Sequence, residues 1–78
     1  MMTKEKLKEL IMAGLECDHI EVKGDDGVHF EALVVSPEFE GRSMLDQHKM
    51  VYATLGDRLE TEEVHALALK TYKSSEWS

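Results

Sequence analysis

The chain has 78 residues, 42% hydrophobic and 32% charged, which is enough for one small domain over residues 1–78 and too little for a second. Nine basic and sixteen acidic residues give a formal net charge of −7, which opposes binding to nucleic acid or anionic lipid unless a local basic patch exists. The single cysteine cannot form an internal disulfide, and we find no signal-like start or membrane-spanning apolar run, so we expect a soluble cytoplasmic protein.

The start of the chain predicts a helix followed by a β-hairpin. Thr3 is a good N-cap residue and Gly14 is a common end signal for a helix. The inward stripe of this helix, at three- and four-residue spacing, is expected to be Leu7, Leu10 and Ile11. Residues 20–23 and 28–35 alternate apolar and polar side chains around the turn sequence Gly24-Asp25-Asp26-Gly27, and this pattern predicts two antiparallel strands.

A second helix is predicted from Ser43, an N-cap residue, to about Leu55, just before the helix breaker Gly56. Its partly buried residues are expected to be Met44, Leu45, His48, Val51, Tyr52 and Leu55. Residues 57–63 predict a short third helix, which leads into a third strand that begins near Val64.

The end of the chain predicts one more helical turn. Ser74 or Ser75 is expected to cap this turn, which docks Trp77 on the domain. The element order is therefore α-β-β-α-α-β-α, an α+β fold in which helices cover one side of a three-stranded sheet. The core is expected to consist of Phe30, Val34, Val51, Leu55, Leu67 and Leu69.

No group of residues predicts an enzyme. Cys17 has no basic neighbour to activate it, and Ser36 and Ser43 lack an oxyanion-loop sequence. The carboxylate pair Glu62-Glu63 lies in a charged stretch that is typical of an exposed surface. We therefore expect a binding protein without catalytic activity.

The histidines are the remaining candidates for chemistry. His19 precedes the first strand as a surface residue, and His48 is placed to pack in the second helix. His29 starts the second strand on the face opposite Phe30, from which it could lie at the sheet edge or reach the start of the third strand, where His65 stands. His65 could be a metal ligand or a histidine at the edge of the core.

Four segments together resemble the BolA family in order and spacing, from about the first helix to the last residue. They are Phe30-Glu31-Ala32-Leu33-Val34-Val35-Ser36, Phe39-Glu40-Gly41, His48-Lys49-Met50-Val51-Tyr52 and Val64-His65-Ala66-Leu67-Ala68-Leu69. The resemblance implies a BolA-like fold, which is similar to a class II KH fold. The short loop between the first two strands resembles the acid-stress-associated bacterial branch of the family.

The resemblance also implies a partner and a metal centre. BolA-like proteins pair with monothiol glutaredoxins, and a shared 2Fe-2S cluster is held by the glutaredoxin cysteine, glutathione and two ligands from the BolA side. A cluster needs four ligands and this chain has one cysteine, so the isolated protein should bind none and be colourless. His65 matches the family's histidine ligand. The second family ligand lies in the shortened loop, and we assign it to His29, with Asp26 in reserve.

We therefore expect a protein that supplies ligands for cluster transfer or for iron and stress regulation. The alternative is a transcriptional regulator that binds DNA through its KH-like surface, with a basic patch formed by Arg42, Lys49, Lys70 and Lys73. Three features oppose it. The G-x-x-G of residues 24–27 joins strands and is acidic, residues 57–63 are mostly acidic, and Gln47 replaces a basic residue of the family. A homodimer is also left open.

Overall fold

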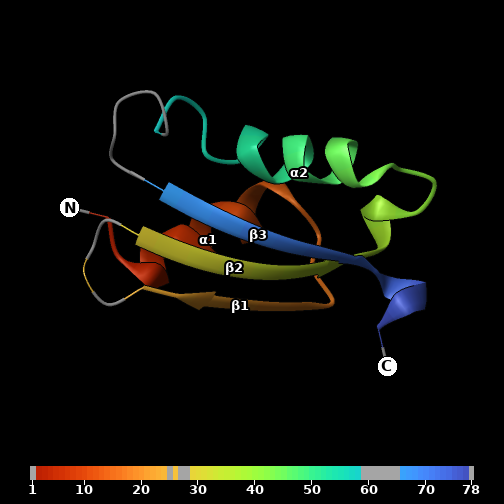
Figure 1. The fold of residues 1–78 in the computed structure, drawn as a ribbon, viewed down its shortest axis with the longest axis horizontal. Helices are drawn as coiled ribbons and strands as arrows, with labels where there is room; N and C mark the ends of the chain where they lie inside the picture. Colours follow the sequence, from red (N-terminus) through yellow and green to blue (C-terminus); the bar gives the residue numbers. More distant parts are fainter. Residues whose placement is uncertain (1, 25, 27–28, 59–65, 78) are drawn as a thin grey trace.

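Figure 1 shows the protein as a computed structural model, which describes residues 2–24, 26, 29–58 and 66–77. Its elements, in chain order, are α1 (Lys4–Gly14), β1 (His19–Lys23), β2 (His29–Ser36), the 3-10 turn η1 (Pro37–Phe39), α2 (Met44–Ala53), β3 (Ala66–Lys73) and the 3-10 turn η2 (Ser74–Glu76). The sheet has the order β1-β2-β3, in which β1 is antiparallel and β3 parallel to β2. The predicted α+β fold with one three-stranded sheet is confirmed.

Both helices cover the same face of the sheet. Fully buried residues of α1 (Leu7 and Ile11) and α2 (Val51) belong to one cluster with Phe30 and Val34 of β2. Burial of this shared apolar face is the main favourable term in folding such a domain. Of the described helices, none has the length and apolarity needed to cross a membrane.

The start of the chain folds as its sequence predicts. The Thr3 hydroxyl accepts a hydrogen bond from the Lys6 N–H at 3.1 Å, and this cap begins α1. The hairpin that follows requires glycine at position 24, because a Cβ atom there would lie 2.4 Å from the ring of Phe30. The turn sequence therefore allows the aromatic ring to pack closely against the backbone at the end of β1.

The burial expected for α2 is confirmed in part: Val51 and Leu55 are buried, and His48 and Tyr52 are half-buried. Ser43 caps it as predicted, by accepting a hydrogen bond from the Asp46 N–H at 3.2 Å. Met44 and Leu45, however, are 68% and 64% exposed, because they belong to the first turn, before the buried stripe begins. That stripe has four-residue spacing and consists of Gln47, Val51 and Leu55. The prediction that Met44 and Leu45 are partly buried is wrong.

In the second half of the chain, the third strand is less deeply buried than predicted. Most of the predicted third helix, residues 59–63, lies outside the described residues, and Asp57 and Arg58 are in a turn. Leu67 and Leu69 contact the core but stay partly exposed, whereas Phe30, Val34, Val51 and Leu55 are buried as expected. The reason is that β3 is an edge strand of the sheet.

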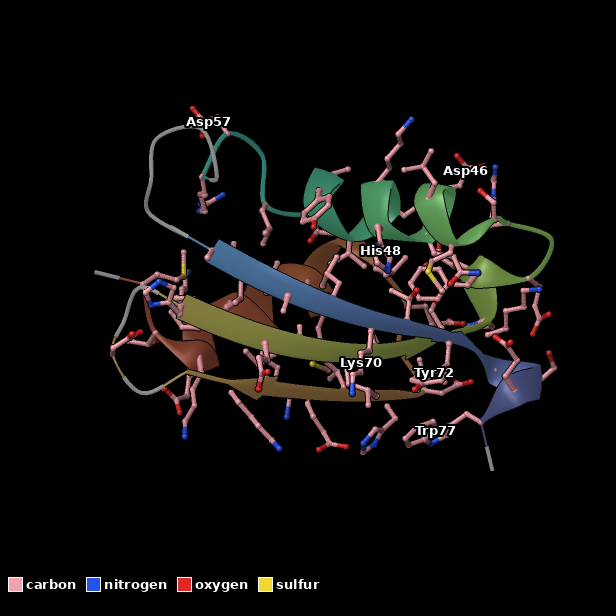
Figure 2. All side chains as sticks on the ribbon, in the orientation of Figure 1. Asp46, His48, Asp57, Lys70, Tyr72 and Trp77 are labelled. Carbon is pink, nitrogen blue, oxygen red and sulfur yellow. The ribbon has the colours of Figure 1, made fainter. Side chains whose placement is uncertain are left out.

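The C-terminal turn is fastened to the domain by contacts that differ from those expected. Trp77 stacks on His19, with ring centroids 5.2 Å apart, and tilts against Tyr72 at 5.5 Å (Figure 2). Docking of Trp77 is thus confirmed. The cap is Lys73, whose backbone N–H donates to Glu76 at 2.8 Å, and neither serine caps the turn. The serines instead bind carboxylates: Ser74 donates to Asp18, and Ser75 to Glu40.

The sheet face without helices carries balanced charges. Lys23 is the register partner of Glu31, and Leu33 lies between Glu21 and Lys70 on the neighbouring strands. Figure 2 shows Lys70, Tyr72 and Trp77 together on this part of the molecule. Alternating opposite charges on neighbouring strands stabilise a solvated face and give it no strong field of either sign.

Candidate functional site

An open hollow of about 680 Å³ lies at the end of the sheet where β2 and β3 begin. Because β1 is antiparallel and β3 parallel to β2, the β1–β2 turn and the start of β3 meet at this end. The lining residues come from all three strands and the turn: Lys23, Gly24, Asp26, His29, Phe30, Glu31, Ala66, Leu67 and Ala68. The topology thus brings His29, the first residue of β2, next to the start of β3.

His29 and Asp26, the two candidates for the second cluster ligand, contact each other in this hollow. The backbone N–H of His29 donates to Asp26 Oδ1 at 2.8 Å, and ring Nδ1 lies 2.8 Å from Asp26 Oδ2. Both side chains are well exposed, 67% for His29 and 55% for Asp26. As predicted, His29 lies on the face opposite Phe30, which is buried.

The other predicted ligand, His65, lies outside the described residues. Its neighbour in the chain, Ala66, is the register partner of His29 and lines the same hollow. His29 and Ala66, the first residues of β2 and β3, therefore lie side by side at the hollow.

Of the described residues that line the hollow, His29 carries a side chain that could bind the iron of a 2Fe-2S cluster. Imidazole nitrogens replace thiolates as ligands in some 2Fe-2S centres. The other ring N–H of a ligating histidine characteristically donates a hydrogen bond to a carboxylate or a carbonyl. Within the described residues, no group of three or more histidine, cysteine or acidic side chains is placed to hold a metal ion. The described residues alone therefore do not complete a four-ligand site.

Cys17 is separate from this hollow. It lies between α1 and β1, at the opposite end of the sheet, and its Sγ donates to the Leu15 carbonyl at 3.3 Å. Burial raises the pKa of the Cys17 thiol, and the negative charges of Glu38, Asp18 and Glu16 raise it further. These surroundings disfavour the thiolate, which is the form needed for nucleophilic attack or metal binding.

Two of the basic residues considered for DNA binding, Lys49 and Lys70, lie on opposite sides of the sheet. Thr71 of β3 bonds to α2, and Lys70, the next residue along this strand, projects to the face without helices. Lys49 is exposed on α2, on the other side of the sheet. The described part of the G-x-x-G sequence, Gly24 and Asp26, joins β1 to β2, as the hairpin interpretation predicts.

Two contacts were not predicted from the sequence. Gln47 is 5% exposed. It accepts a hydrogen bond from Thr71 Oγ1 at 2.7 Å and donates to the Arg42 carbonyl at 2.9 Å. It joins α2 to β3. The Asp26–His29 contact had a signal in the sequence, since an aspartate in a turn often bonds a group a few residues later.

The fold and the site define a class of protein: a small α+β domain with helices on one face of a mixed sheet and a histidine-lined hollow at one end. The sequence model described as BolA-like protein matches residues 11–76. The chain therefore belongs to the BolA family.

Three known proteins illustrate this relationship. The "DNA-binding transcriptional regulator BolA" of Escherichia coli (strain K12) is 36% identical over 86 residues, which cover 99% of this chain and 81% of the relative. The "Acid stress protein IbaG" of the same organism is 29% identical over 77 residues, covering 99% of this chain and 90% of the relative. The solved structure of a bolA protein homologue from Coxiella burnetii superimposes with a TM-score of 0.84 at 41% identity, covering 99% and 97% of the two chains.

Proposed function

We propose that this protein is a non-catalytic cytoplasmic partner of a monothiol glutaredoxin and supplies histidine ligands to a 2Fe-2S cluster shared by the two proteins. The observation that carries the proposal is the carboxylate-bound His29 in the hollow beside the start of β3, next to which His65 stands in the chain. The glutaredoxin cysteine and the thiol of glutathione supply the other two ligands.

The shared site gives the protein its mechanism. Two imidazoles cannot hold a cluster alone, so the cluster forms only in the complex and separates when the partners do. Imidazole must be neutral to bind iron, which makes the complex sensitive to acid. A centre with these properties suits cluster transfer, or regulation by iron or stress. The printed name of the relative IbaG, an acid stress protein, is in keeping with such a role.

The proposal is tested by mixing the protein with a monothiol glutaredoxin, glutathione and an iron–sulfur source. Visible absorption and circular dichroism should show a spectrum that glutaredoxin alone does not give. His65→Ala should abolish this spectrum and His29→Ala should weaken it. The control is His48→Ala, which should retain the spectrum because His48 lies on α2, away from the hollow. A full spectrum from His65→Ala would contradict the proposal.

A second candidate function is DNA binding, which is favoured by the printed name of the E. coli relative. It would depend on Arg42, Lys49, Lys70 and Lys73, of which Lys49 and Lys70 lie on opposite sides of the sheet. A gel-shift assay of the isolated protein over a series of salt concentrations tests it, because a phosphate-driven complex weakens steeply with salt. Absence of any shift at low salt would exclude this candidate.

A further inference from the structure

Asp26 binds residue 29 at two points. One carboxylate oxygen accepts the backbone N–H of His29, and the other contacts ring Nδ1, each at 2.8 Å. The backbone contact ties the carboxylate to the first residue of β2, so the second oxygen meets the ring from a fixed direction. The pair therefore sets both the orientation of the imidazole and the position of its proton.

The position of the proton follows from the chemistry of the two groups. An ionised carboxylate has no hydrogen to donate, so Nδ1 of His29 must be the donor. A neutral imidazole carries one proton, and with that proton on Nδ1 the lone pair that a metal requires is on Nε2.

We infer that Asp26 is a positioning residue: it holds His29 in the Nδ1–H tautomer and presents Nε2 to the iron of the shared cluster. The inference rests on the proposed function. In this role Asp26 does not bind the iron itself, as it would if it were the alternative ligand, but acts by positioning His29. Carboxylates that bind metal-ligating histidines in this way fix the ring and raise its basicity.

A second carboxylate–histidine pair in the same chain provides a matched control. Glu21 Oε2 lies 2.7 Å from Nε2 of His19, so this pair holds the other ring nitrogen. His19 stacks on Trp77 at the far end of β1, away from the residues that line the hollow. A change in the Glu21 pair therefore tests the effect of altering a histidine tautomer without altering the hollow.

The first measurement uses the protein alone. Long-range ¹H–¹⁵N correlation spectra of the labelled full chain report which nitrogen of each imidazole is protonated. We expect wild-type His29 to carry its proton on Nδ1. In Asp26→Asn the amide oxygen can still accept the backbone N–H, while the amide nitrogen donates to Nδ1, so the proton should move to Nε2. Glu21→Gln should change His19 and leave His29 as it was. A wild-type His29 protonated on Nε2 would overturn the inference.

The second measurement is the affinity for the cluster, taken from the dichroism amplitude as each variant is titrated into glutaredoxin, glutathione and an iron–sulfur source. Asp26→Asn should bind about 10- to 100-fold more weakly, the range typical for loss of a group that supports a metal ligand. Glu21→Gln should bind like wild type, and thermal melts of both variants should match the parent, since both pairs are exposed.

The outcomes separate the inference from the function on which it rests. If Asp26→Asn binds the cluster like wild type while His29→Ala does not, the inference fails and the proposed function stands. If the wild-type mixture forms no cluster, the proposed function fails and the role of Asp26 toward iron fails with it. A weakened Asp26→Asn together with a reversed His29 tautomer supports both.

Discussion

The surroundings of Cys17 hold its sulfur as a thiol. Burial is the larger cause of the raised pKa, and the carboxylates of Glu38, Asp18 and Glu16 add to it. Two of these neighbours adjoin Cys17 in the sequence, whereas Glu38 approaches only through the fold, where it also accepts the Glu16 N–H at 2.6 Å. The sequence alone therefore indicates two of the charges that raise the pKa of the Cys17 thiol, whereas the third is seen only in the folded structure.

We predict that iodoacetamide modifies Cys17 more slowly in the folded protein than in the urea-unfolded chain at pH 8, because the thiolate fraction is smaller in the folded state. Glu38→Gln should speed the folded-state reaction by removing one negative charge. Because the pKa of the Cys17 thiol is raised in the folded state, this group contributes to the stability of the fold at pH values below the unfolded cysteine pKa of about 8.5. That contribution is lost as pH rises through the folded-state value. Mass spectrometry of timed samples measures the rates, and equal rates in both states would contradict the prediction.

A buried polar pair joins α2 to β3. Gln47 and Thr71 hydrogen-bond at 2.7 Å, and each is less than a tenth exposed. Caps and apolar spacing in the sequence predicted where α1, the hairpin and α2 begin, because those signals are local. They predicted the burial of Val51 and Leu55 but not that of Gln47, because its hydrogen-bond partner is a threonine in a strand far along the chain.

Thr71→Val should lower the free energy of unfolding by about 1–3 kcal/mol, because it leaves the buried Gln47 oxygen without its hydrogen-bond donor. The double variant Gln47→Leu/Thr71→Val should recover part of this loss, since it removes both polar partners. Urea unfolding of the two single variants and the double variant gives the coupling energy. Additive losses would show that the two side chains act independently.

Across the whole molecule, burial is deepest where the two helices meet β2. The six expected core residues all contact the core, yet only the four from β2, α2 and the residues just after α2 are completely or almost completely buried. Family resemblance identified the fold, and the cluster site that it implies stays a prediction. The depth of β3 required coordinates, because the position of a strand within a sheet cannot be read from that strand alone.

Leu55→Ala should lower the free energy of unfolding by about 2–5 kcal/mol, the usual range for a fully buried leucine. Leu67→Ala should cost less, because Leu67 lies on the edge strand and is only partly buried. Urea midpoints measured on the two variants test this order. A larger loss from Leu67→Ala would mean that β3 is covered more completely than the structure shows.

The parallel pairing of β2 with β3 determines when the hollow can form as the chain folds. The register partners His29 and Ala66 are separated by the whole of α2, whereas α1 and the hairpin depend on neighbouring parts of the chain. Non-local pairings of this kind form late, because a long loop must close first. A chain emerging from the ribosome should therefore complete α1 and the hairpin well before β3 is available to form the hollow. An unfinished chain should then be unable to bind a partner at the hollow.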